Sequence, residues 1–129
     1  MFKKKWEENR VKADDHLKAY HLYLQGKTAL GCNKPETALK FFLQSAELDA
    51  HFKTFEQMYY CFICLKKEDS ALEAIKKAYY QNPCNDKVAY LYACQLKKHG
   101  DALLSRKIAN EVNRRNPSYR PQEIKRLME

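Results

Sequence analysis

Residues 52–83, FKTFEQMYYCFICLKKEDSALEAIKKAYYQNP, decide the fold of this chain. Apolar side chains in the first half recur at intervals of three and four residues, the spacing of one face of an α-helix. This stripe consists of Phe55, Met58, Tyr59 and Phe62. A polar break at residues 66–70 follows, and a second helical run ends before Pro83, because proline disfavours a further helical turn. The stretch therefore predicts two helices joined by a tight turn.

The same unit recurs on both sides of this stretch. The second helix of each unit is expected to end near Ala50, Pro83 and Pro117, which lie 33 and 34 positions apart. Twelve residues before each of these ends stands a small residue: Ala38, Ala71 and Ser105. Self-similarity at such a period is the signature of a stacked repeat. The chain is therefore expected to form three consecutive helix–turn–helix units.

Small and large side chains are distributed as close packing of antiparallel helices requires. Two helices approach closely where one lacks a bulky side chain, and larger side chains fill the adjoining gaps. The expected contact points are Gly26, Ala38, Ala71, Ala78 and Ala93, and the expected gap-filling residues are Phe42, Phe55, Phe62, Ile75 and Leu96. The second helices are expected at about residues 35–48, 70–81 and 101–115. Pro35 suits a first turn, and Ser70 and Asp101 suit N-caps.

This pattern resembles the tetratricopeptide repeat over about residues 19–119. The resemblance is best in the middle unit. The residues that match the family's preferred types and spacing there are Phe55, Met58, Phe62, Ala71, Ile75, Ala78 and Pro83. The first unit departs from the pattern at Gln25 and Ala50, and the third at Ala89 and Ala109. An unrelated antiparallel helical bundle is the alternative fold.

The resemblance implies an all-α fold: a short right-handed α-solenoid of three helix–turn–helix repeats at about residues 19–51, 52–85 and 86–119. An amphipathic helix at residues 1–18 and a capping helix at residues 120–129 are expected to flank the repeats. The apolar stripe of the first is Phe2, Trp6, Ala13 and Leu17, and that of the second is Ile124, Leu127 and Met128. We expect both to cap the stack. A docking or homodimer role for the N-terminal helix is the alternative.

Composition and charge are those of an ordinary globular protein. The chain has 129 residues and a formal net charge of +8, and residues 1–12 and 114–129 each hold five basic and two acidic residues. The body between them is close to neutral, which argues against a dedicated nucleic-acid domain. Five cysteines, no secretory leader and no apolar run long enough to span a bilayer predict a cytoplasmic protein with free thiols.

The resemblance also implies a binding surface, because the first helices of such repeats line a concave side. The residues expected there are Tyr20, Tyr23, Lys27, Lys53, Glu56, Gln57, Tyr60, Cys64, Lys87, Tyr90, Cys94 and Lys97. Tyrosine offers a large, rigid contact surface with a polar tip, and lysine attracts carboxylates. We therefore expect a non-catalytic protein–protein interaction module, an adaptor or small chaperone. Its partner is expected to be a peptide or helix with acidic and apolar residues.

Two specific branches of the family fit less well. Some members clamp the C-terminal carboxylate of a partner with lysine and asparagine residues on successive first helices. Of that set only Lys87 is retained, since Tyr23, Lys27, Gln57 and Leu91 occupy the other positions. Heat-shock chaperone tails are therefore not the expected partner. Three repeats behind an N-terminal helix also resemble the chaperones of bacterial type III secretion translocators, but only in architecture.

No motif of a catalytic or cofactor site is evident, so an enzyme, a cofactor and a small-molecule substrate are not expected. Cys61 and Cys64 form a CxxC pair, but it lies inside an expected helix, away from the helix N-terminus that would stabilise a thiolate. As a zinc site it lacks a second pair of ligands. We therefore expect structural cysteines and no metal.

Polyanion binding is the alternative function. The basic residues near the C-terminus, accompanied by Tyr119, have the composition of a site for phosphates or a stacked base. The expected contacts are Arg114, Arg115, Arg120, Lys125 and Arg126. Salt distinguishes the two functions, because phosphate binding falls steeply with ionic strength.

Overall fold

The computed structural model describes residues 2–129, with side chains from Lys12 onward. These residues form seven helices and no strand, which confirms the expected all-α fold. The helices are α1 (Phe2–Gly31), α2 (Pro35–Leu48), α3 (Phe52–Cys64), α4 (Glu68–Gln81), α5 (Asp86–Lys98), α6 (Ala102–Arg115) and α7 (Pro121–Met128). Within this described part, no helix is long and apolar enough to cross a membrane.

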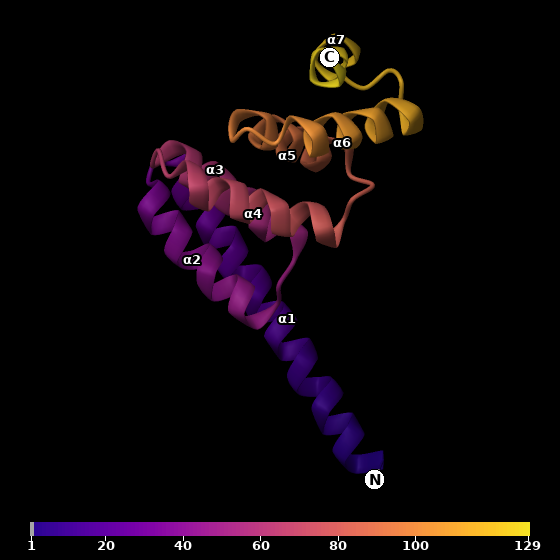
Figure 1. Ribbon diagram of the computed structural model, residues 1–129. Helices are drawn as coiled ribbons and strands as arrows, with labels where there is room; N and C mark the ends of the chain where they lie inside the picture. The colour runs from indigo at the N-terminus through magenta and orange to yellow at the C-terminus, as the bar shows by residue number, and fades with distance from the viewer. Residues whose placement is uncertain (1) are drawn as a thin grey trace.

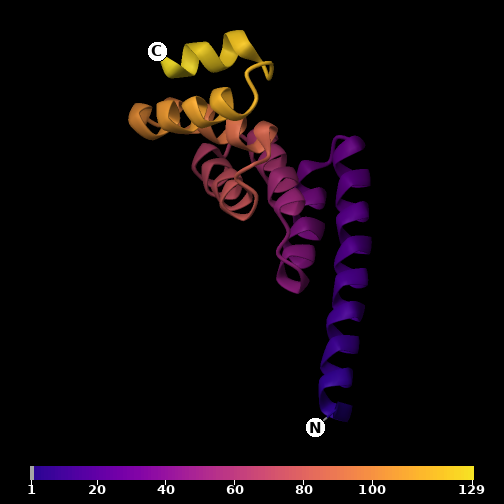
Figure 2. The same cartoon turned by 90° about the vertical axis from the view of Figure 1, so that its right-hand side faces the viewer.

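Consecutive helices form antiparallel pairs that stack along the chain (Figure 1). The pairs are α1 with α2, α3 with α4, and α5 with α6, and each pair also contacts the next. Helix α7 lies against α6 at the C-terminal end of the stack (Figure 2). Its stripe residues Ile124 and Leu127 are buried there, so this segment covers the last apolar interface as expected.

The same turn ends the first helix of every repeat. Asn33, Lys66 and Gly100 have positive φ angles of 60°, 58° and 92°, and they lie at the sequence period of 33 and 34 residues. The next N–H donates to a carbonyl oxygen five residues back. These hydrogen bonds join Lys34 to Ala29 (3.0 Å), Lys67 to Phe62 (2.9 Å) and Asp101 to Leu96 (2.8 Å). Each first helix therefore ends in a left-handed cap that reverses the chain.

Close helix contacts occur where the small residues predict them. All five expected contact points are buried, and among the gap-filling residues only Phe62 is partly exposed. Gly26 of α1 faces the ring of Phe42 on α2 so closely that a Cβ atom at Gly26 would lie 2.5 Å from the ring. The α1–α2 pair therefore depends on a missing side chain on one helix and a fully buried ring on the other.

The N-terminal end differs from the expectation. The sequence pattern predicts a separate helix at residues 1–18, whereas α1 runs unbroken through this region as the first helix of the first repeat. No glycine or proline precedes Gly26, so no residue ends a helix near position 18. Ala13 and Leu17 are exposed instead of capping the stack. The side chains of Phe2 and Trp6, also part of that prediction, lie outside the described residues.

The predicted N-cap at Ser70 is wrong, whereas the other two helix-start predictions are confirmed. Helix α4 begins at Glu68 with Lys67 as its N-cap residue, so Ser70 lies in the first turn. The left-handed turn before it is already complete at Lys67, and the acidic residues that follow favour the positive end of the helix dipole. Asp101 caps α6 by accepting a hydrogen bond from the Leu104 N–H at 3.2 Å. Pro35 is the first residue of α2.

Candidate functional site

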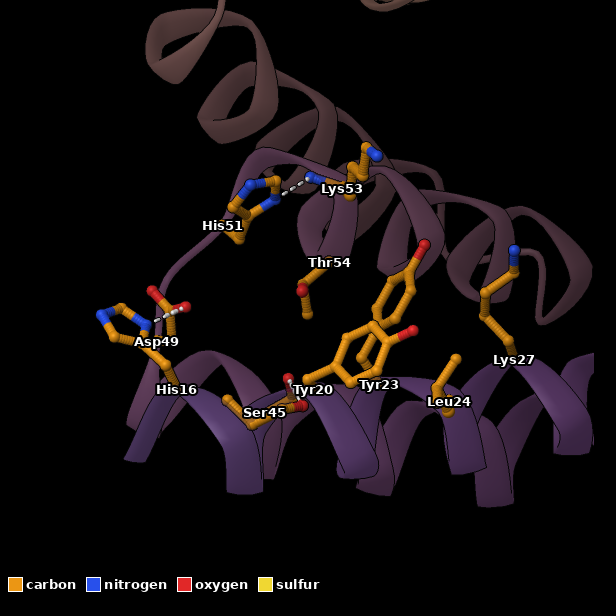
Figure 3. A pocket seen from close by; sticks show the side chains of 11 residues that line it. His16, Tyr20, Tyr23, Leu24, Lys27, Ser45, Asp49, His51, Lys53 and Thr54 are labelled. Atoms are coloured by element: carbon orange, nitrogen blue, oxygen red, sulfur yellow. Dashed lines mark hydrogen bonds and ion pairs between the residues drawn. The ribbon is translucent and has the colours of Figure 1, made fainter. Parts of the chain in front are cut away.

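A pocket of about 440 Å³ opens between α1, the end of α2 and the start of α3 (Figure 3). Four of the residues expected in the groove line it: Tyr20, Tyr23, Lys27 and Lys53. The remaining lining residues are His16, Ala19, Leu24, Ser45, Asp49, His51 and Thr54. These were not expected from the sequence, because the spacing along the first helices does not reveal how wide the pocket is on α1 and α3, or that the end of α2 and the loop after it complete the pocket.

Three polar contacts fix the walls of this pocket. The Ser45 hydroxyl, buried on α2, donates to the Ala19 carbonyl oxygen of α1 at 2.7 Å. At the other wall the His51 ring caps α3, since its Nδ1 accepts from the Lys53 N–H at 3.2 Å. At the outer edge His16 Nδ1 lies 2.6 Å from Asp49 Oδ2. The pocket is therefore held by contacts from three successive helices.

The rim of the pocket combines aromatic surface with positive charge. Tyr20 is 56% exposed, whereas Tyr23 is partly buried, and this burial, with the nearby Glu56 carboxyl, raises the pKa of Tyr23. The Lys27 ammonium lies 5.8 Å from the centre of the Tyr23 ring, a cation–π distance. Among the described residues, no carboxylate lies within 4.0 Å of the Lys27 or Lys53 ammonium. Both charges therefore remain available to a ligand.

The middle of the predicted groove is neutralised internally. Lys87 Nζ on α5 lies 2.9 Å from Glu56 Oε1 on α3, and the carboxylate side chain is only 10% exposed. The Tyr60 hydroxyl donates to the same oxygen at 3.4 Å, and Lys87 Nζ lies 5.6 Å from the centre of the Tyr60 ring. The hydrogen bond with Glu56 raises the pKa of Lys87. Next to them Gln57 is partly buried. These residues share one surface, but the two charged ones, Lys87 and Glu56, neutralise each other.

The C-terminal end of the predicted groove is occupied by the chain itself. The Arg120 guanidinium lies 4.9 Å from the centre of the Tyr90 ring and 5.9 Å from that of Tyr119. Lys97 Nζ donates to the Arg126 carbonyl oxygen at 3.3 Å, which ties α5 to α7. Tyr90 and Lys97 therefore hold the C-terminal segment in place.

The basic residues proposed for polyanion contacts are largely paired within the chain. Arg115 donates to Asp86 Oδ1 from two nitrogens, at 3.1 and 2.8 Å, and Arg114 donates to Glu111 at 2.6 Å. Burial opposes ionisation of Asp86, but hydrogen bonds from Asn116 and Arg115 outweigh it and lower its pKa. Lys125 and Arg126 have exposed side chains on α7. The five residues thus do not act as one cluster of uncommitted charge.

The five cysteines are free, and Cys61 is fully buried inside α3. Of the two in the predicted groove, Cys64 is exposed and Cys94 is partly buried, and burial raises the pKa of Cys94. No group of three or more His, Cys, Asp or Glu residues in the described part of the chain is arranged to hold a metal ion. The CxxC pair lies in the second half of α3, away from the helix N-terminus.

Cys61 is expected to be chemically inert in the folded protein. Burial, with a smaller contribution from Cys64, raises the pKa of its thiol to about 11, and the thiolate is the reactive form. At pH 8 a thiol-specific dye should therefore label the exposed Cys32, Cys64 and Cys84, and Cys61 only after unfolding in urea. Mass spectrometry of the labelled peptides measures this. Labelling of native Cys61 as fast as that of Cys64 would contradict the expectation.

Comparison with solved structures establishes the fold. The second TPR domain of human RPAP3, in complex with the HSP70 peptide SGPTIEEVD, matches with a TM-score of 0.75 and 14% identity, over 89% of this chain and 98% of that one. The Arabidopsis OM64 TPR domain matches with a TM-score of 0.74 and 14% identity, over 88% and 97% of the two chains. The chain has the tetratricopeptide-repeat fold.

Other solved structures match with similar TM-scores and sequence identities. The Yersinia enterocolitica type III secretion chaperone SycD, in complex with a peptide of the translocator YopD, has a TM-score of 0.69 and 15% identity, over 84% of this chain and 87% of SycD. At such identities the likeness concerns the fold alone. No protein-family model matches the sequence, and no curated protein matches it either.

Proposed function

We propose that this tetratricopeptide-repeat chain is a non-catalytic protein-interaction module, an adaptor or small chaperone of the cytoplasm. It binds a peptide or helical segment of another protein. The observation that carries the proposal is the pocket between α1 and α3, where two lysines stand beside the exposed ring of Tyr20 and no carboxylate of the described residues pairs with either lysine. Domains of the same fold, from RPAP3 and SycD, have been solved with bound peptides, which supports this use of the surface.

The lining of the pocket defines the chemistry of the ligand. Lys27 and Lys53 attract a carboxylate, and Tyr20 and Leu24 offer apolar contact next to them. The ligand is therefore a segment in which an acidic residue lies close to an aliphatic or aromatic one. The rest of the predicted groove offers the ligand little free charge or aromatic surface, because Lys87 is paired with Glu56 and Tyr90 is covered by Arg120.

Selection from a random peptide library displayed on phage, with the full chain as bait, tests the proposal. Enriched peptides should combine Asp or Glu with a large apolar residue. In fluorescence polarisation, the variant Tyr20→Ala/Lys27→Ala/Lys53→Ala should bind them at least about tenfold more weakly. Tyr80→Ala/Lys76→Ala/Lys107→Ala is the matched control, since it removes the same residue types from exposed positions on second helices. Equal losses in both variants would refute the pocket as the site.

The same assay distinguishes peptide binding from polyanion binding. A single-stranded oligonucleotide serves as the second probe at low and raised salt. Polyanion binding would fall steeply with salt and would be lost in Lys125→Ala/Arg126→Ala, whereas binding at the pocket should be indifferent to that variant. Oligonucleotide binding tighter than that of every selected peptide would overturn the proposed function.

A further inference from the structure

The pocket between α1 and α3 has two chemically different ends. Its α1 side is one helical face that begins with His16 and ends with Lys27, 11 positions later. Figure 3 shows His16 beside Asp49 at one end of this row and Lys27 at the other, with Tyr20 and Tyr23 between them. At 1.5 Å per residue the two ends lie about 16 Å apart along α1. The pocket is therefore an elongated site whose ends differ in charge.

The positive end has a counterpart one repeat later. Lys87 is the repeat equivalent of Lys53, 34 positions further along the chain, and it pairs with Glu56 at 2.9 Å. The repeat equivalent of Glu56, 33 positions earlier, is Tyr23. The first interface between repeats thus keeps the lysine but has a tyrosine in place of the carboxylate, and Lys27 adds a second ammonium. A ligand carboxylate between Lys27 and Lys53 would supply the pairing that Glu56 supplies in the next repeat.

The opposite end of the pocket carries a carboxylate. Asp49 Oδ2 lies 2.6 Å from His16 Nδ1, and the Asp49 side chain is 30% exposed. Its other oxygen, Oδ1, forms no hydrogen bond with the described residues. Residues 12–18 of α1 hold two lysines and two aspartates, whose charges cancel, so Asp49 determines the sign of this end. A lysine or arginine of a ligand fits there.

We propose that the pocket binds an extended segment of a partner protein with a basic, an apolar and an acidic residue at alternate positions. The basic residue pairs with Asp49, the apolar one lies against Tyr20 and Leu24, and the acidic one lies between Lys27 and Lys53. Every second side chain of an extended chain points to the same side, so residues four positions apart span about 13 Å. The lengths of their side chains cover the remaining distance. The inference rests on the proposed function and adds the second charge and the spacing.

The size of the pocket favours an extended ligand over a helical one. A helix with its side chains is about 10 Å wide and fills roughly 1,200 Å³ over a length of about 16 Å. The pocket measures only about 440 Å³. In a helical ligand, residues four positions apart are separated by only about 6 Å along the axis, so a helix would need about 11 positions between its two charges. The spacing of the charges in a bound peptide therefore reports its conformation.

The peptides selected with the full chain as bait test the spacing. Lys or Arg and Asp or Glu should occur four positions apart, with a large apolar residue midway and in one consistent order. A spacing of about 11 positions would overturn the extended conformation, and the absence of a basic residue would overturn the role of Asp49. Either result would leave the proposed function intact. If no selected peptide binds Tyr20→Ala/Lys27→Ala/Lys53→Ala more weakly, the proposed function is refuted, and this inference with it.

A double-mutant cycle tests Asp49 directly. The two probes are one fluorescein-labelled selected peptide and its copy in which glutamine replaces the basic residue. Binding is measured at pH 8, because protonation of His16 would offset the Asp49 charge. Asp49→Asn should weaken binding of the first peptide about two- to fivefold, the effect of a partly exposed ion pair, and leave that of the glutamine peptide unchanged.

The cycle separates the ion pair from structural effects of the substitution, because a distorted pocket would weaken the binding of both peptides. Glu47→Gln is the matched control, since it also removes one negative charge, from an exposed position on α2 that does not line the pocket. Equal losses for the two peptides in Asp49→Asn, or an equal loss of the first peptide in Glu47→Gln, would overturn the contact with Asp49.

Discussion

Replacement of Phe42 by alanine is expected to lower the free energy of unfolding by about 3–5 kcal/mol. Phe42 is completely buried between α2 and α1, where its ring fills the space left by Gly26. Its ring centre also lies 5.9 Å from that of Tyr23, which lines the pocket. The cavity cannot close easily, because the buried hydrogen bond between Ser45 and Ala19 holds the same two helices at their present separation. The free-energy loss therefore has two parts that add: the lost burial of the ring and the cost of the cavity that remains.

Urea denaturation followed by circular dichroism measures this loss. Phe41→Ala is the control, because Phe41 is the same residue type on the same helix but is only partly buried, and it faces a shallow surface groove. We expect the control to lose about 1 kcal/mol or less. Similar losses in the two variants would show that Gly26 and Phe42 do not form a close-packed contact of special importance.

The repeat architecture could be predicted from the sequence because the backbone conformation repeats with the same spacing as the residue types. The spacing of 33 and 34 residues found between helix ends recurs in the left-handed residues Asn33, Lys66 and Gly100. Only one of these is glycine, so a search for turn residues alone would have missed the regularity. The apolar pattern located the buried faces, since Ala38 and Ala71, both predicted contact points, are fully buried.

The apolar pattern does not reveal whether an apolar helical face will be covered by the rest of the chain. Ala13 and Leu17 have the spacing of a buried helical face, and this spacing predicts a cap over the chain's own first repeat. The structure leaves both exposed, since α1 continues straight. Periodicity reports that a face is apolar, but the end of a helix depends on a local terminating residue, and none stands near position 18.

The sequence predicted which residue types share the surface of the candidate site. It did not predict which of the charged residues pair with each other. The helical register placed Tyr20, Tyr23 and Lys27 on one surface, and the structure places them there. It could not show that Lys87 would reach Glu56, which lies 31 positions earlier, because stacking of separate repeats sets that distance. Lysines that look equivalent in the sequence therefore differ in the structure.

Replacement of Lys87 by methionine is expected to lower the free energy of unfolding by about 2–3 kcal/mol. Removing one partner of a fully buried ion pair costs about 3–5 kcal/mol, and the loss here is smaller because the Lys87 side chain is 57% exposed to screening solvent. Since the pair raises the pKa of Lys87, its stabilisation is complete below the usual lysine pKa. It is lost as the pH rises through the raised value, which lies far above pH 7, so measurement at pH 7 captures the whole effect of the ammonium.

A double variant identifies the cause of that loss. In Lys87→Met the Glu56 carboxylate stays buried with only the Tyr60 hydroxyl, at 3.4 Å, as a partner among the described residues. Glu56→Gln/Lys87→Met removes the stranded charge, so it should recover most of the stability in urea denaturation. If the double variant is less stable than Lys87→Met, the loss comes from packing of the lysine side chain and not from the charge.

The same pair has a consequence for binding that runs opposite to its effect on stability. Glu56→Gln leaves the Lys87 ammonium beside Tyr60 without its carboxylate, which adds an available positive charge next to the pocket. Acidic peptides should therefore bind this variant several-fold more tightly by fluorescence polarisation, although the protein is less stable. Glu73→Gln is the control, because it changes the net charge equally from an exposed position on α4. A gain confined to Glu56→Gln would mean that the internal ion pair limits the affinity of the groove for acidic partners, whereas equal gains would reduce the effect to overall charge.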